Sequence, residues 1–352
     1  MHAAIDPQRR LGGDIETTRA RRRAVVAVSF VLVGAAAVAA WRITRPPAPW
    51  TALGPAAGIV RALALEPRPP SALYAGTSDG GLLVRVPGES SWRSVALGAG
   101  ARVDVRAVAL DGRDPPIVYV GTGRGRLFAS RDRGATWRDM PLPGTSAPTL
   151  VSAIGVDPTD ATRVYVGTGG GAILTTTDGG AGWSRLEHPI GVADVVALLV
   201  DPRDHDTIYA ATAGAGVGRS RDGGRSWEPM SAGLSSPTVE ALAIESHPPV
   251  VLYAATSGGG VNVSDAQGAW HAASTGLSTA VTWSLAVDAT RAGTVYAGGS
   301  GGQVFVSTDR GARWRALPAP AVDTAWALAL DAATDVLYVG TSGRGVFMRS
   351  ER

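Results

Sequence analysis

Seven repeats with a period in the low forties predict an all-β fold, a seven-bladed β-propeller. The 7 tyrosines of the chain lie 42 to 46 residues apart, and each opens a similar short string of small and apolar residues. With 46 glycines and 23 prolines in 352 residues that are 45% hydrophobic, the chain is too turn-rich for a helical bundle and too apolar for disorder. The tyrosines are Tyr74, Tyr119, Tyr165, Tyr209, Tyr253, Tyr296 and Tyr338.

Each repeat contains four short segments with strand character, separated by turns. The first is apolar and ends in an acid, as in Arg106–Asp111, and a polar turn such as Asp157–Asp160 follows it. The tyrosine strand comes next, then a glycine turn such as Thr168–Gly171 and a third strand. A second polar turn leads to a fourth strand that begins at tryptophan. Four short strands in a repeat of this length are typical of a propeller blade.

The two ends of the repeat region predict how the ring closes. Residues 48–54, which include Trp50, have the character of a fourth strand with no preceding three. The last repeat, from Trp326, supplies three strands and stops before a tryptophan. We therefore expect residues 48–54 to complete the last blade, so that the propeller occupies residues 48–352 with no open edge between its first and last blades.

The turn before the fourth strand carries a recognisable motif. Ser220–Trp227 and Ser130–Trp137 match S-x-D-x-G-x-[ST]-W, and the turns at Thr176–Trp183 and Ser307–Trp314 match it except at the penultimate position. The turn at Ser264–Trp270 is one residue short. We expect the aspartates to bond turn amides and the tryptophans to pack between blades, a structural role. These residues are Asp132, Asp178, Asp222, Asp265, Asp309, Trp137, Trp183, Trp227, Trp270 and Trp314.

This motif resembles the Asp-box of sialidase-type (BNR) repeats. The resemblance covers residues 48–352 and extends to sialidases, xyloglucan-cleaving glycoside hydrolases, sortilin-type receptors and photosystem II assembly and stability factors. The sialidases use a tyrosine nucleophile, whereas every tyrosine here belongs to a repeat. The xyloglucanases need two facing carboxylates, for which only Asp194 and Glu240 can be nominated. The photosystem II factors carry seven blades and an arginine patch that meets a membrane-protein partner.

One position in the first strand of each repeat varies while its neighbours barely change, so packing does not fix its identity. Its occupants, in blade order, are Arg61, Arg106, Ser152, Val196, Glu240, Trp283 and Trp326. Glycine turns on the same face add Arg124, Arg344 and, less centrally, Arg126. Our hypothesis is an arginine patch with an aromatic shelf, flanked by Glu240, that receives an anionic group of a partner. The alternative is that the arginines are merely solvated and the two tryptophans fill the channel.

The N-terminal residues predict a membrane anchor. Residues 1–23 form an arginine-rich arm, residues 24–41 are uncharged and long enough to span a bilayer, and residues 42–47 form a proline-rich linker. Arginines before the apolar run place the N-terminus in the cytoplasm and the propeller in the periplasm or outside the cell. Signal-peptide cleavage at Ala37–Ala39, near the end of the run, is the alternative and would give a secreted, soluble, ligand-binding propeller.

Charge and composition exclude several classes of function. Residues 1–45 carry eight arginines and three acids, so the remaining residues have a net charge of −2 and give no support for nucleic-acid binding. The absence of cysteine excludes thiol chemistry and cysteine-ligated metals, and the histidines have no metal-ligand spacing. We expect no metal, no cofactor and no catalytic residue, and a membrane-anchored scaffold that binds a protein partner, with assembly of a membrane complex as one such role. A carbohydrate-active hydrolase is the enzymatic alternative.

Overall fold

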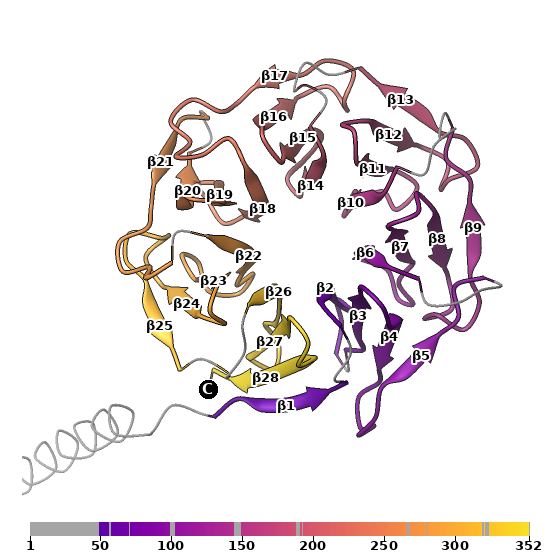
Figure 1. Cartoon of the computed structure of the whole chain (residues 1–352). Coiled ribbons are helices and arrows are strands. Elements are labelled where there is room, and N and C mark those ends of the chain that lie inside the picture. Colours follow the sequence, from indigo (N-terminus) through magenta and orange to yellow (C-terminus); the bar gives the residue numbers. More distant parts are fainter. Residues whose placement is uncertain are drawn as a thin grey trace, which may run out of the picture. The chain divides into compact units, whose positions relative to one another are not determined.

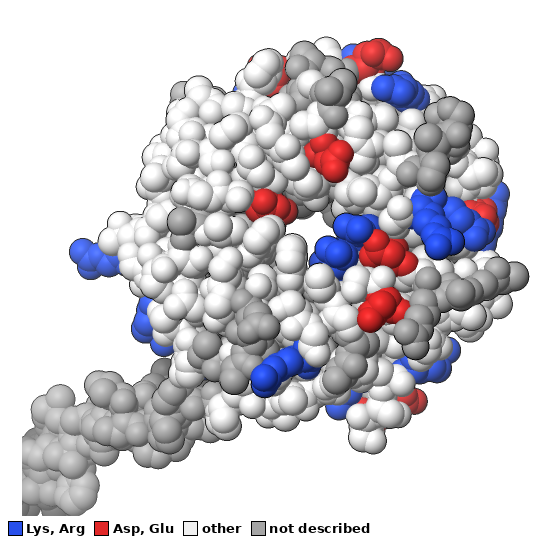
Figure 2. Space-filling view, viewed as in Figure 1, with Lys and Arg blue, Asp and Glu red and all other residues white. Residues whose placement is uncertain are grey.

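The structure, a computed structural model, is a ring of seven four-stranded antiparallel sheets around a central axis (Figure 1), where the space-filling view shows the opening of a channel (Figure 2). It describes residues 49–55, 58–69, 71–98, 103–143, 149–187, 191, 193–265, 268–279, 281–318, 320 and 324–351. Every element in these residues is a strand, so the predicted all-β seven-bladed propeller is confirmed. The propeller forms one compact unit from Pro49 to Arg352.

The strands of each blade are ordered from the channel outward. Blade 1 holds β2 Val60–Leu65, β3 Leu73–Thr77, β4 Gly81–Arg85 and β5 Arg93–Val95, and blade 2 holds β6 Val105–Leu110, β7 Val118–Thr122, β8 Leu127–Ser130 and β9 Arg138–Met140. Blade 3 holds β10 Val151–Val156, β11 Val164–Thr168, β12 Ile173–Thr176 and β13 Ser184–Leu186, and blade 4 holds β14 Val195–Asp201, β15 Asp204–Thr212, β16 Gly216–Ser220 and β17 Glu228–Pro229. Blade 5 holds β18 Val239–Glu245, β19 Val251–Thr256, β20 Gly260–Ser264 and β21 Trp270–Ala272, and blade 6 holds β22 Thr282–Val287, β23 Val295–Gly299, β24 Val304–Ser307 and β25 Arg315–Leu317.

Blade 7 joins the two ends of the propeller. It contains β26 Ala325–Asp331, β27 Val336–Thr341 and β28 Val346–Ser350, and its outer strand is β1 Thr51–Gly54. Strand β1 runs antiparallel to β28, with Thr51 opposite Met348 and Gly54 opposite Val346. Figure 1 shows these two strands side by side at the rim. The N-terminal strand therefore closes the last blade, as the sequence predicts.

The hydrophobic core is divided among the seven seams between neighbouring blades. At the first seam, Tyr74 and Leu82 of blade 1 pack with Val120 and Phe128 of blade 2, and Trp137 covers them from blade 2. Because each sheet has a neighbour on both faces, its second strand is largely buried, and β3 and β7 are buried along their whole length. The stability of every blade thus depends on the blades beside it.

The predicted N-terminal regions are not part of this description. The arm 1–23, the apolar run 24–41 and the linker 42–47 all lie outside the described residues. Within the residues described, the structure contains no helix of the length and hydrophobicity that a membrane crossing requires.

Candidate functional site at the mouth of the channel

A β-bulge at the start of every innermost strand builds the mouth. In blade 1, Val60 pairs with Thr77 and Ala62 pairs with Gly76, so Arg61 between them has no partner in the ladder. A bulge of this kind bends the strand and redirects the extra side chain. The same break occurs in all seven blades, at the variable position identified in the sequence. The bulged residues are Arg61, Arg106, Ser152, Val196, Glu240, Trp283 and Trp326.

Two arginines share one carboxylate on one side of the mouth. The Arg106 Nε donates to the Asp104 Oδ2 at 2.7 Å, and the Arg61 Nε lies 3.6 Å from the Asp104 Oδ1. The three side chains are 32%, 23% and 27% exposed, in the order Arg106, Arg61 and Asp104. Burial and the nearby Arg106 charge lower the pKa of Arg61, and Asp104 partly opposes them. One carboxylate against two guanidinium groups leaves this side of the mouth with a net positive charge.

Two tryptophans continue the mouth next to these arginines. The rings of Trp283 and Trp326 lie 4.4 Å apart between centroids at an interplanar angle of 39°. The Trp283 Nε1 donates to the Ser300 Oγ at 3.1 Å. The guanidinium carbon of Arg61 lies 5.8 Å from the Trp326 ring centroid, within the range of a cation–π contact. The predicted arginines and aromatic shelf are therefore brought together at one site.

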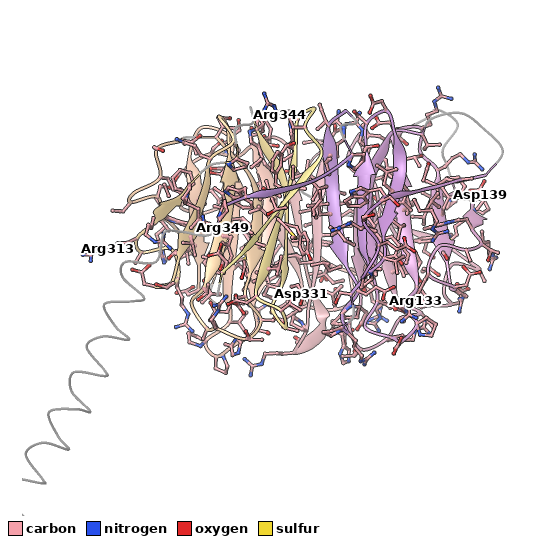
Figure 3. The ribbon with its side chains drawn as sticks, turned by 90° about the horizontal axis from the view of Figure 1, so that it is seen from below. Arg133, Asp139, Arg313, Asp331, Arg344 and Arg349 are labelled. Atoms are coloured by element: carbon pink, nitrogen blue, oxygen red, sulfur yellow. The ribbon has the colours of Figure 1, made fainter. Side chains whose placement is uncertain are left out.

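The other predicted basic residues lie farther from the channel axis. Arg124 and Arg344 are exposed in the turns between the second and third strands of blades 2 and 7. Figure 3 shows Arg344 on one face of the propeller, with Arg133 and Asp331 on the opposite face. Arg126 pairs with Asp139 of the outer strand β9. Figure 2 shows a largely uncharged face, with both basic and acidic side chains around its central opening.

The two acids nominated for a hydrolase have different surroundings. Asp194 is exposed, and its Oδ1 accepts a hydrogen bond from the Gly170 N in the turn of the neighbouring blade, at 2.8 Å. Glu240 is half-buried, and burial raises the pKa of its carboxyl group. No hydrogen bond joins these two acids in the described part of the chain. Nor do any three described histidine, aspartate or glutamate side chains gather in a cluster that could hold a metal ion.

The Asp-box residues act within turns on the opposite face. The Asp132 carboxylate accepts hydrogen bonds from the Thr136 N at 2.8 Å, the Thr136 Oγ1 at 2.5 Å and the Ser130 Oγ at 2.8 Å. These bonds lower the pKa of Asp132 to about 2. Asp222 is held in the same way, and turn bonds also hold the remaining box acids, Asp178, Asp265 and Asp309.

The box tryptophans pack where neighbouring blades meet. Trp137, Trp183 and Trp227 are partly buried against three of the seam cores. Trp270 is a buried member of a fourth. The fifth, Trp314, belongs to the core between blades 5 and 6, and its Nε1 donates to the Ala273 O of blade 5 at 2.6 Å.

Two ion pairs between blades, each with a buried glutamate and a partly exposed arginine, were not predicted from the sequence. The Glu245 carboxylate accepts bonds from the Arg310 Nη2 at 2.9 Å and the Tyr253 hydroxyl at 3.0 Å. Glu66 contacts Arg133 in the same way, at 3.1 Å. The sequence does mark these two pairs: Glu66 and Glu245 end the first strands of their repeats, where the other five repeats have aspartate. The acid Asp104 was also missed, although it lies only two residues before Arg106.

Residues 74–325 match the family described as Photosynthesis system II assembly factor YCF48. A solved structure of YCF48 bound to D1 peptide has 18% identity, a TM-score of 0.67, and coverage of 87% of this chain and 97% of that one. YCF48 from Cyanidioschyzon merolae has 18% identity, a TM-score of 0.64, and coverage of 86% and 98%. A comparison with curated protein sequences gives no match.

Enzymes of the GH74 class share the same fold. The GH74 enzyme of Niastella koreensis has 16% identity and a TM-score of 0.71, with coverage of 85% of this chain and 53% of that one. The GH74 xyloglucanase of Xanthomonas campestris has 20% identity and a TM-score of 0.67, with coverage of 86% and 53%. This chain therefore spans about half the length of these enzymes, and such identities show a shared fold alone.

Proposed function

The chain belongs to the Photosynthesis system II assembly factor YCF48 family, and on that premise we propose that it is a non-catalytic propeller that binds a protein partner during assembly of a membrane complex. The mouth of the channel is the binding site. The YCF48 structure that contains a D1 peptide supports a protein partner for this fold. The partner of this chain is a protein of the membrane or envelope that presents an anionic group.

The arrangement of Arg61, Arg106 and Asp104 carries this proposal. Two guanidinium groups with a single carboxylate keep donors available for an incoming carboxylate, which arginine binds in a forked geometry. Trp326 beside Arg61 adds apolar contact area at the same place. The bulges that position these side chains belong to the inner strands, so the side chains project from rigid strands and not from flexible loops.

A double substitution tests the binding site. Arg61→Gln with Arg106→Gln removes both charges, and we expect at least a ten-fold loss of the protein captured from solubilised membranes, measured by quantitative mass spectrometry. Arg313→Gln with Arg315→Gln is the matched control, since both residues are exposed in and after the turn of blade 6. Equal capture by the two double variants, each with an unchanged melting temperature, would refute the proposed site.

We place the propeller outside the cytoplasm, held by a single-pass anchor in residues 24–41. The support is the arginine-rich segment before the apolar run, which follows the positive-inside rule. N-terminal sequencing of the mature protein separates this proposal from a cleaved, secreted propeller. Protease added to intact spheroplasts should degrade the propeller, and protection of the propeller under those conditions would contradict its external position.

A glycoside hydrolase is the second candidate. The fold shared with the GH74 enzymes, the tryptophan pair and the raised pKa of Glu240 favour it, since a general acid needs a proton near neutral pH. Its partner carboxylate is harder to find, because the Asp194 carboxylate is already engaged by the Gly170 amide. Release of reducing sugar from xyloglucan, lost in Glu240→Gln, would establish this activity, and we expect none.

A further inference from the structure

The bulged residues of neighbouring blades form a continuous arc along the mouth. Trp283 of blade 6 contacts Trp326 of blade 7, Trp326 lies next to Arg61 of blade 1, and Arg61 shares Asp104 with Arg106 of blade 2. Each of these contacts joins adjacent inner strands at the same position in the repeat. Glu240 occupies this position in blade 5, whose inner strand β18 packs against β22 of blade 6. Glu240 therefore holds the equivalent position in the blade next to that of Trp283.

Glu240 is half-buried at this face, and its carboxylate lacks the partners that Asp104 and Asp194 have. Asp104 is bonded by Arg106, and Asp194 accepts a turn amide. Within the described residues, Glu240 forms no hydrogen bond or ion pair, although it is half-buried. Burial alone accounts for the raised pKa of its carboxyl group. A half-buried carboxylate without a cation favours a positively charged ligand, which would restore the lost solvation.

Besides the carboxylate of Glu240, the cation-binding subsite needs an aromatic ring, which Trp283 supplies. Its Nε1 is bound to the Ser300 Oγ at 3.1 Å, and its ring packs at a tilt against Trp326. An indole held on two sides has a fixed orientation, and the face of an indole attracts lysine and arginine side chains. Trp326 already receives the Arg61 guanidinium group in a contact of this type.

We propose that Glu240 and Trp283 form a subsite for a lysine or arginine side chain of the bound protein segment. This inference rests on the proposed function, because it concerns the same segment whose anionic group lies at Arg61 and Arg106. The mouth thus selects an extended segment that carries an acidic group at one end and a basic side chain at the other. The tryptophan pair lies between the two charged subsites and accepts the apolar part of the segment.

Synthetic peptides test the two subsites separately. The probes are N-acetylated peptides with a free C-terminal carboxylate and one lysine placed about two to five residues before it, a span of roughly 7–17 Å in an extended chain. In a second series, norleucine replaces lysine, which removes the charge and keeps most of the side-chain length. Fluorescence anisotropy gives the affinity of each peptide for the full chain and its variants.

We expect the lysine peptide with the best spacing to bind about ten-fold more tightly than its norleucine counterpart, from a cation–π contact and an ion pair together. Glu240→Gln should remove most of this difference and leave the norleucine affinity unchanged. Glu89→Gln, an exposed glutamate in a turn of blade 1, is the matched control and should preserve the difference.

The outcomes distinguish the subsite from the function on which it rests. If norleucine peptides bind the unmodified protein as tightly as lysine peptides, or if Glu240→Gln weakens both series equally, the cation subsite is wrong. The proposed function survives that result when Arg61→Gln with Arg106→Gln still weakens both series. If no peptide binds the unmodified protein at millimolar concentration, or the arginine variant binds both series normally, the anion site fails together with the cation subsite.

Discussion

Replacement of Arg310 by alanine should destabilise the propeller through the seam between blades 5 and 6. Glu245 has no exposed side-chain surface, and four hydrogen bonds satisfy its carboxylate. Two of these come from Arg310 and the others from the Tyr253 hydroxyl and the Gly293 amide. Arg310→Ala leaves a buried negative charge with two neutral donors and no cation.

The size of the effect follows from burial and backbone geometry. Removal of one member of a buried ion pair costs about 3–5 kcal/mol, and the lower value applies because the Arg310 side chain is 36% exposed. With an unfolding entropy of about 2.1 cal/mol/K per residue over roughly 300 residues, 3 kcal/mol lowers the melting temperature by about 5 °C. Arg310 also has φ of 56°, a conformation that glycine adopts without strain. Arg310→Gly should therefore recover about 1 kcal/mol relative to alanine.

Differential scanning calorimetry at neutral pH measures these shifts. Arg313→Ala, an exposed residue three positions along the same turn, should change the melting temperature by less than about 1 °C, as surface substitutions generally do. An equal shift for Arg310→Ala and Arg313→Ala would show that the buried pair does not stabilise the seam. Equal melting temperatures for Arg310→Ala and Arg310→Gly would refute only the contribution of backbone strain, not that of the ion pair.

Three other substitutions or deletions follow from the structure. Asp132 has a folded pKa of about 2, below its ordinary value of 3.8, so its stabilising effect is complete above about pH 4 and lost as the pH falls toward 2. The difference in melting temperature between the unmodified protein and Asp132→Asn should thus narrow over that interval, and a constant difference would contradict it. Deletion of residues 1–54, which removes β1, should abolish the single cooperative transition, whereas deletion of residues 1–48 should preserve it; identical calorimetric traces would refute closure by β1. Gly233→Ala places a Cβ 2.0 Å from the Trp270 O and should cost about 1–3 kcal/mol more in urea denaturation than Gly258→Ala, which has the same φ of 87° and meets no atom within 4 Å.

The sequence is sufficient to predict the ring because its repeats are regular. The tyrosine spacing gives the number of blades, and the unmatched strand at Trp50 gives the closure. The variable position in the first strand coincides with the bulged residue in each of the seven blades. Wide variation at a position whose neighbours change little indicates that packing leaves that side chain free.

The pairing of charges at the mouth and at the seams could not be predicted in the same way. A bulge breaks the alternation of side chains, so the sequence does not reveal that Arg61 and Arg106 converge on Asp104. Arg126 pairs with Asp139 and does not lie at the mouth, because the geometry of its turn directs the side chain toward the outer strand. Glu245 and Arg310 lie 65 residues apart, in different repeats, and only the packing of one blade on the next brings them together.

Closure by β1 has a consequence for synthesis of the protein. The first strand of the propeller to leave the ribosome pairs with β28, which is the last, so the ends to be joined are about 300 residues apart and their closure costs roughly 5 kcal/mol of chain entropy. Until that join forms, the outer edge of β28 stays unpaired and the two terminal blades lack one neighbour each. A chain that ends prematurely can never form it. A truncated chain therefore keeps an exposed strand edge that a full-length chain covers. We expect proteases to degrade the truncated chain faster.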